Sequence, residues 1–346
     1  MNRRRFVALG TCAVALFPRA ARATGGLDVA DPGPAISVRV LLASGSFAGP
    51  EPIDAWHFGW SGRTYRGAFA NAALPGGRSA LVNVVPLDAY LAGVISSEIP
   101  SGWPDAMQHA QAIVSRTYVL GRLHPERPYD VVASESDQHY SGIEGESLAG
   151  RAAVDSTAGT TLTYLGAPAH VAYSSCCGGR TADAGDVWGV SFPYLPSVPD
   201  PHCFGTPNYA WNADIPLANV AAAFGAPFAA IGTLRAARLE TNTPDDRPRG
   251  IGFDGDRSSF ETTPKAFRAA LGAAVVRSTF VRSLDLGRPG SLAVTGSGRG
   301  HGVGLCQWGA RIMAYDGASA QEILSFYFPG TALGHAQPER ERGHAE

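Results

Sequence analysis

Alternation of apolar and polar residues is the dominant pattern in the first part of the chain. The run ISVRVLLA at residues 36–43 alternates as a half-buried strand does, and similar short runs follow at 55–62, 63–69 and 79–86. Glycine and proline residues separate these runs and mark turns. We therefore expect a series of short β-strands, largely antiparallel, in this part of the chain.

Two helices are predicted next, with a short loop between them. The run LDAYLAGVIS at residues 87–96 is helical in character. Beyond Pro104, apolar residues recur at the i, i+3, i+4 spacing of an amphipathic helix as far as Tyr118. Proline suits the first turn of a helix, so Pro104 marks its start. The intervening loop, EIPSGWP, begins with a single carboxylate, Glu98, which lies between two segments expected to pack in the core.

The remainder of the chain is a mixture of short predicted helices and strands. Residues 210–295 contain helical runs such as PKAFRAALGAAV and strand-like runs such as SLAVTG. The whole pattern predicts an α+β fold, mostly antiparallel strands with packed helices, over residues 36–334. We expect either one elongated domain or two closely joined lobes.

The N-terminal segment has a different character. Residues 1–23 combine a basic start, an apolar stretch and Ala21-Arg22-Ala23, which is the layout of a cleaved signal peptide, and RRRFV resembles a twin-arginine signal. Residues 24–35 are predicted to be a linker and residues 335–346 a disordered tail. No later run reaches the about 18 apolar residues of a spanning helix. We therefore expect an exported protein, periplasmic or otherwise extracytoplasmic, with no membrane span in its mature form.

Composition narrows the function classes further. The chain has 346 residues and a formal net charge of -2, and a nucleic-acid binder usually shows a basic patch, so no nucleic-acid partner is expected. Four cysteines remain once the signal segment is removed: Cys176, Cys177, Cys203 and Cys306. An even number in an exported protein permits disulfides. None of them forms the paired CxxC motif that strongly indicates zinc.

Several blocks, taken in order, resemble the SpoIID/LytB family of bacterial envelope proteins. They include PLDAYLAGVISSEIPSGWPDAMQHAQAIVSRTY, QHYSG, AYSSCCGGRTADAGDVWG and GRGHGVGLCQWGARIMA, and the similarity runs from about Ile36 to Thr331. Members of the family are implicated in peptidoglycan remodelling. The sporulation member is a lytic transglycosylase that degrades glycan strands lacking peptide stems, and its catalytic glutamate lies in the block that SSEIP matches. The resemblance therefore implies that Glu98 is the catalytic residue.

A single glutamate suffices for that reaction, whereas most glycosidases use two carboxylates. One acid protonates the oxygen of the MurNAc–GlcNAc bond. The resulting carboxylate then deprotonates the C6 hydroxyl of the same muramic sugar, which closes a 1,6-anhydro ring. Such an acid needs a pKa raised by partial burial. We expect apolar neighbours of Glu98 to supply it: Val94, Ile95, Ile99 and Trp103.

Other residues in the matching blocks are candidates for binding the glycan. An arginine on the next helix can orient the carboxylate or bind a sugar hydroxyl, and the amide and ring in QHYSG suit sugar recognition. The alternating glycines around His301 let a backbone approach another backbone or a ligand closely. We expect the glycan to lie in a groove between the Glu98 segment and this glycine segment. A purely structural role is the alternative for these residues. The candidate substrate-binding residues are Arg116, Gln138, Tyr140, Ser174, His301 and Gln307.

No cofactor is required for this chemistry, but a structural zinc ion is compatible with the sequence. Some relatives carry zinc near the block that HVAYSSCCGG matches, so the resemblance implies His170 and Cys176 as ligands, with Cys203 or Cys177 brought to them by folding. The competing interpretation, which we favour, is a disulfide between Cys203 and either Cys176 or Cys177.

Two other function classes are considered. The amidase-enhancer member of the family implies a non-catalytic protein that binds peptidoglycan and stimulates a cell-wall amidase. A cysteine hydrolase built from Cys306 and His301 is disfavoured, because such pairs usually come from distant segments of the sequence.

Overall fold

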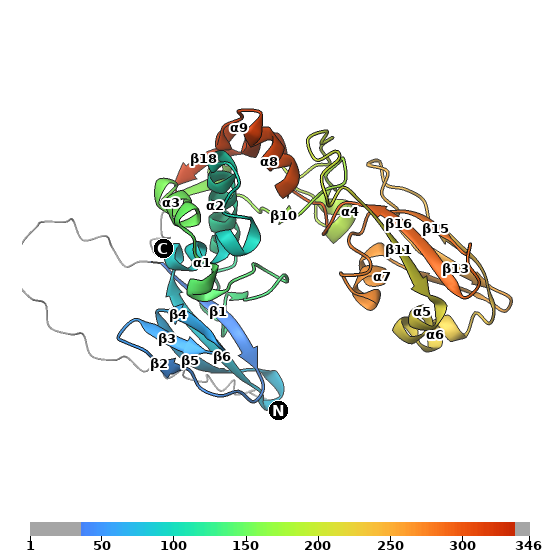
Figure 1. The fold of residues 1–346 in the computed structure, drawn as a ribbon, viewed down its shortest axis with the longest axis horizontal. Coiled ribbons are helices and arrows are strands. Elements are labelled where there is room, and N and C mark those ends of the chain that lie inside the picture. Colours follow the sequence, from blue (N-terminus) through green and yellow to red (C-terminus); the bar gives the residue numbers. More distant parts are fainter. Residues whose placement is uncertain (1–35, 336–346) are drawn as a thin grey trace, which may run out of the picture. The chain divides into compact units, whose positions relative to one another are not determined.

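A computed structural model describes residues 36–335, which fold as two compact units (Figure 1). The first unit comprises the described residues up to Glu98 together with Arg122–Ser147, and the second comprises Ile99–Gly121 and the described residues from Leu148 onward. The predicted signal peptide, linker and most of the predicted tail lie outside the described residues. His335, which we assigned to the tail, instead belongs to the last strand.

The first unit is built on a four-stranded sheet of order β5-β6-β1-β7, in which only the β1–β7 pair is parallel. A second sheet, β2-β3-β4, is antiparallel throughout. The elements of this unit are β1 (Ser37–Ser44), β2 (Glu51–Pro52), β3 (His57–Trp60), β4 (Arg63–Arg66), β5 (Ala68–Ala73), η1 (Pro75–Gly77), β6 (Ser79–Pro86), α1 (Leu87–Glu98), β7 (Val131–Val132) and η2 (Gly142–Gly145).

The period-two pattern of the first run is confirmed as strand β1. Val38 and Val40 are fully buried, while the residues between and before them keep some exposure. β6 runs directly into α1 without a loop, and α1 packs on β6, β1 and η2. This direct connection ties the helix that carries Glu98 to the central strands of the sheet.

The second unit contains the remaining elements, arranged around several small sheets. The strand orders are β18-β8-β9, β11-β16-β15, β12-β13-β14 and the parallel pair β10-β17. Its elements are α2 (Asp105–Leu120), α3 (Leu148–Ser156), β8 (Thr160–Tyr164), β9 (Ala167–Pro168), β10 (Tyr173–Ser174), α4 (Ala184–Trp188), β11 (Ala210–Pro216), α5 (Leu217–Phe224), α6 (Ala226–Ala229), β12 (Leu234–Leu239), β13 (Ile251–Gly255), β14 (Ser259–Thr262), α7 (Pro264–Leu271), β15 (Val281–Asp285), β16 (Ser291–Ser297), β17 (Leu305–Cys306), α8 (Gln307–Tyr315), α9 (Ala320–Tyr327) and β18 (Ala332–His335).

Helix α2 is the central element of one part of this unit. It packs against α3, β8, α8 and α9 (Figure 1), so its predicted apolar stripe is buried, and several polar residues are buried with it. A separate apolar cluster joins β11, β13, β16 and the helices beside them, with Phe253 and Phe267 fully buried.

The predicted α+β class, with mostly antiparallel strands and packed helices, is confirmed. Among residues 36–335, no helix combines the length and the apolar character needed to cross a membrane.

Candidate functional site

Glu98 lies at the C-terminal end of α1. The helix buries Tyr90, Val94 and Ile95 completely, while its last three residues, from Ser96 onward, are half-buried. Pro100 follows closely, and proline disfavours helical conformation in the residue before it, so the helix ends here. The carboxylate is therefore presented at a helix end, beside the core yet within reach of solvent.

A backbone amide from a distant loop holds this carboxylate. The N–H of His139 donates to Glu98 Oε1 over 2.6 Å. A hydrogen bond from an amide to a carboxylate is short and strong compared with one between neutral groups. The bond fixes the orientation of the Glu98 side chain and joins the predicted catalytic block to the QHYSG block.

Buried side chains fix the loop that supplies this amide. Tyr140 donates its hydroxyl to Asn83 Oδ1 over 2.9 Å, and Tyr90 donates to Gln138 Oε1 over 3.0 Å. Gly93 is required on the facing side of α1, because a Cβ atom there would lie 2.7 Å from the Tyr140 ring. The loop therefore lies directly against α1, with His139 placed between two anchored residues.

This geometry changes the role of two predicted sugar-binding residues. Gln138 is fully buried and Tyr140 is 2% exposed, and burial raises the pKa of the Tyr140 hydroxyl well above its ordinary value. Neither side chain offers a surface to a sugar, so we assign both to support of the His139 amide. The sequence did not indicate His139, because this residue contributes a backbone N–H group and the residue type does not reveal such a role.

Arg116 also has a different role from the predicted one. Its side chain is fully buried on α2, and its guanidinium donates to the carbonyl oxygens of Thr157 over 2.8 Å and Val154 over 3.1 Å. These acceptors lie in α3 and just after it. Arg116 therefore satisfies the end of a neighbouring helix in the second unit, and we leave it out of the proposed site.

The predicted close approach of the alternating glycines is confirmed, and at Gly298 and Gly304 the partner is backbone. A Cβ atom at Gly298 would lie 2.5 Å from the carbonyl oxygen of Cys176, and one at Gly304 would lie 2.2 Å from that of Ala172. Both glycines have positive φ, which other residues adopt at a cost. The segment is thereby laid along the 172–176 segment, where β10 and β17 pair in parallel.

His301 lies between two of these glycines, largely buried. Its Nδ1 accepts the N–H of Val303 over 3.0 Å, and its ring packs against Trp188 with centroids 5.2 Å apart. Burial of the ring, and secondarily the charge of Arg247, lower the pKa of His301 to about 4. The imidazole is therefore neutral at physiological pH, with its proton on Nε2.

The two remaining predicted residues are mostly buried. Gln307 is 6% exposed and donates to Gln111 Oε1 over 3.4 Å. Ser174 is 7% exposed, and its hydroxyl has no hydrogen-bond partner within residues 36–335. It lies beside Gly300, where an added Cβ atom would approach it within 2.9 Å.

An aromatic pair on the second unit joins Trp103, which the sequence placed among the expected neighbours of Glu98, to Trp308, which it did not assign to the site. The rings of Trp103 and Trp308 have centroids 5.1 Å apart, and the guanidinium of Arg311 lies over both. All three side chains are partly exposed. Amphipathic rings at a partly wet surface are suited to binding polar ligands that have an apolar face. The signal in the sequence was tryptophan in both the SGWP and the QWGA blocks.

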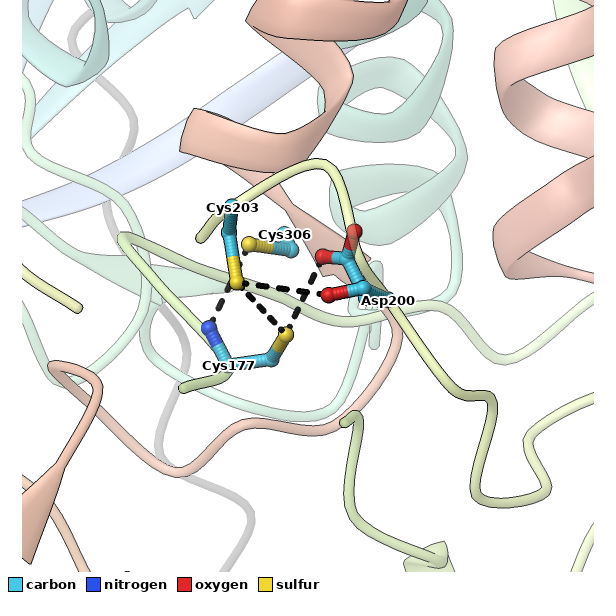
Figure 2. Close-up of side chains that lie close together, drawn as sticks. All are labelled: Cys177, Asp200, Cys203 and Cys306. Carbon is cyan, nitrogen blue, oxygen red and sulfur yellow. Dashed lines mark hydrogen bonds between the residues drawn. The ribbon is translucent and has the colours of Figure 1, made fainter. Parts of the chain in front are cut away.

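A compact group of metal-binding side chains lies elsewhere in the second unit. The sulfur atoms of Cys177, Cys203 and Cys306 and a carboxylate oxygen of Asp200 lie within 4.8 Å of one another. Figure 2 shows these four side chains gathered together. All four residues are buried. Burial raises the pKa of Asp200, whereas hydrogen bonding, most strongly to Cys176, lowers the pKa of the Cys203 thiol.

The predictions about the cysteines need correction. All four described cysteines are free thiols, and Cys177 Sγ and Cys203 Sγ lie 3.5 Å apart, so the disulfide that we favoured is absent. The implied zinc ligand His170 is exposed and packs its ring on Phe192 instead. Asp200 and Cys306, and not His170, lie close to Cys203.

Comparison with known proteins identifies the family of this chain. The family model described as "Stage II sporulation protein" matches residues 76–164, which contain both Glu98 and His139. An uncharacterized protein of Brachyspira hyodysenteriae is 30% identical over 265 residues, covering 73% of this chain and 68% of that protein. The chain belongs to the SpoIID/LytB family.

Two named relatives are more distant. Stage II sporulation protein D of Bacillus subtilis is 26% identical and covers 74% of this chain and 76% of its own length. The amidase enhancer of Bacillus subtilis is 28% identical over 70% of this chain, which corresponds to 40% of the enhancer.

The blocks that carry the SpoIID/LytB resemblance are distributed over both units. Glu98, Gln138 and Tyr140 lie in the first unit, where the fold brings them together. Arg116, Ser174, His301 and Gln307 lie in the second. The groove between the Glu98 and His301 segments therefore stays a prediction.

The buried imidazole of His301 predicts a pH dependence of stability. In the unfolded chain a histidine has a pKa of about 6.5, whereas in the folded protein the pKa of His301 is about 4. The neutral imidazole therefore gives its full stabilisation of the folded protein above about pH 6.5. That stabilisation is lost as the pH falls toward 4, by about 2 kcal/mol after allowance for partial exposure.

Chemical unfolding measured across this range should show the loss. His301→Gln should flatten this part of the profile, while at about pH 7.5 its difference from wild type should reflect packing alone. An unchanged slope in the variant would assign the dependence to other groups.

Proposed function

We propose that this protein is an exported peptidoglycan lytic transglycosylase that cleaves the MurNAc–GlcNAc bond and leaves 1,6-anhydro-MurNAc ends. The observation that carries the proposal is the Glu98 carboxyl at the end of α1, with one oxygen held by the His139 N–H. Family membership, through a model whose matched range contains both residues, supports a role in the cell wall.

The proposed reaction uses Glu98 twice. Its carboxyl group gives a proton to the glycosidic oxygen as the bond from that oxygen to C1 of the muramic sugar breaks. The C6 hydroxyl of the same sugar then bonds to C1, and its proton passes to the Glu98 carboxylate. The acid is regenerated, and neither water nor an enzyme nucleophile is consumed.

The His139 amide supports this cycle by holding the carboxyl in one orientation. Positioned acid–base groups lose efficiency when they rotate freely, because the proton must travel between fixed atoms over hydrogen-bond distances. The buried Tyr140–Asn83 and Tyr90–Gln138 pairs fix the amide in turn. The partly exposed Trp103–Trp308 pair is a suitable surface for sugar rings.

Product analysis tests this function directly. The purified protein should be incubated with peptidoglycan sacculi, both with stem peptides retained and with them removed by an amidase. Mass spectrometry of the soluble products should detect muramic ends that are lighter by one water than hydrolysed ends. Products with ordinary reducing ends would instead identify a hydrolase.

A second candidate function is a non-catalytic activator of a cell-wall amidase. The similarity to a protein named amidase enhancer favours it. In that case wild type should release no glycan fragments from either kind of sacculus, and should accelerate stem-peptide release by an added amidase. Glycan strands are the proposed binding partner in both cases, and both functions require a location outside the cytoplasm.

A further inference from the structure

We propose that Cys177, Cys203, Cys306 and Asp200 form a structural site for one zinc ion. The site is separate from Glu98, and its existence does not depend on the proposed reaction. Its ligand set also differs from the one that the family resemblance implies. Of the residues implied there, Cys203 and its alternative Cys177 belong to the group of four, whereas His170 and Cys176 do not (Figure 2).

The donor types and their spacing fit zinc. Thiolates about 2.3 Å from a tetrahedral zinc ion lie about 3.8 Å from one another. Cys177 Sγ lies 3.5 Å from Cys203 Sγ and 3.1 Å from Asp200 Oδ2, so small side-chain movements would admit the ion. Sulfur-rich tetrahedral sites select zinc over magnesium or calcium, which prefer oxygen ligands in larger shells.

Backbone amides already donate to the sulfur atoms, as they do around metal-bound thiolates. Cys306 Sγ accepts N–H groups from Cys177 over 3.3 Å and from Gly309 over 3.4 Å. Cys203 Sγ accepts the N–H of Gly179 over 3.2 Å. Such donors outside the ligand sphere orient the ligands and offset their negative charge.

The carboxylate ligand is oriented in the same way. Asp200 Oδ2 accepts the hydroxyl of Tyr327 over 3.0 Å, and Oδ1 accepts the N–H of His202 over 3.0 Å. A buried aspartate without a cation nearby is costly. A divalent ion bound to the group would neutralise part of that charge as the three thiols release their protons to solvent.

The site would fasten three segments that are far apart in sequence. Cys177 follows β10, Asp200 and Cys203 lie in the loop before β11, and Cys306 is the N-cap of α8. Cys306 also ends the glycine segment that contains His301. The inferred role of zinc is therefore to fix this segment and the start of α8, and not to activate water, since four protein ligands leave no open position.

The adjacent cysteines make a sharp test possible. Cys176 hydrogen-bonds to Cys203 beside the same cluster, yet its sulfur is not among the four mutually close ligand atoms, and it also contacts Thr206 Oγ1 at 3.9 Å. Full-length protein and its variants should be purified without chelator, and their metal content measured by elemental analysis. We expect about one zinc ion per chain in wild type and in Cys176→Ser, and little or none in Cys177→Ser and Asp200→Asn. Tyr327→Phe should retain the ion with about tenfold weaker affinity.

Cobalt substitution tests the ligand set in wild type, so the result does not depend on variants that fold. Replacing zinc with Co²⁺ should give the visible bands of a tetrahedral ion and a thiolate-to-metal charge-transfer band whose intensity matches three sulfur ligands. Loss of zinc from Cys176→Ser but not from Cys177→Ser would overturn the assignment. So would metal-free protein whose mass is lower by two hydrogens, which indicates a disulfide, or an iron–sulfur chromophore.

Discussion

Glu98→Gln should reduce the release of anhydro-muramic products by about 10²–10⁴-fold, the usual contribution of a positioned general acid–base group. The amide oxygen of glutamine can still accept the His139 N–H, so the local structure should be retained. Glutamine cannot give a proton to the glycosidic oxygen or take one from the C6 hydroxyl. The measurement is the rate of product release from sacculi, followed by mass spectrometry.

Glu144→Gln is the matched control for this variant. Glu144 lies in the same unit and also accepts a backbone amide, the N–H of Thr64, over 2.9 Å. It is exposed, and the proposed reaction gives it no role. The control should therefore release products at the wild-type rate. Equal activity in Glu98→Gln and wild type would remove Glu98 from the mechanism, whereas an amidase stimulated equally by both would favour the activator function.

Arg116→Met should lower the free energy of unfolding by about 3 kcal/mol, because the buried carbonyl oxygens of Thr157 and Val154 lose their charged donor. Methionine keeps much of the side-chain length, so the loss should come mainly from unpaired polar groups. Chemical denaturation measures the change. Activity per folded molecule should stay near the wild-type value, which would not hold if Arg116 contacted the glycan.

Arg249→Met provides the comparison. The Arg249 side chain is 53% exposed and forms one ion pair, 3.1 Å from Asp186, and such surface pairs contribute less than about 1 kcal/mol. If the two substitutions destabilised the protein equally, burial of Arg116 would not be the cause. If Arg116→Met changed substrate affinity without changing stability, the original sugar-binding prediction would be restored.

Local patterns determined much of the secondary structure. The alternation at residues 36–43 corresponds to β1, the apolar spacing beyond Pro104 corresponds to α2, and the direct run from SALVNVVP into LDAYLAGVIS corresponds to β6 followed by α1. The alternation of β1 is visible because one face of that strand is more deeply buried than the other, and burial of one face imposes a period on the residues themselves. β6 and α1 are buried on most sides and are indicated by continuous apolar runs instead. The alternating glycines likewise predicted close backbone approach, since absence of a side chain is a local property.

The tertiary structure alone decided which polar groups meet. Cys177 and Cys306 lie 129 residues apart in sequence, and nothing local to either indicates that Asp200 joins them. In the sequence, Arg116 resembles an arginine on a helix surface, and only the packing of α3 shows that it is buried. Glu98 accepts a hydrogen bond from the backbone amide of His139, and every non-proline residue has such an amide. Composition and spacing reflect what a single helix or strand requires of its own residues. The meeting of distant groups depends on how whole elements pack, and that information is spread over the entire chain.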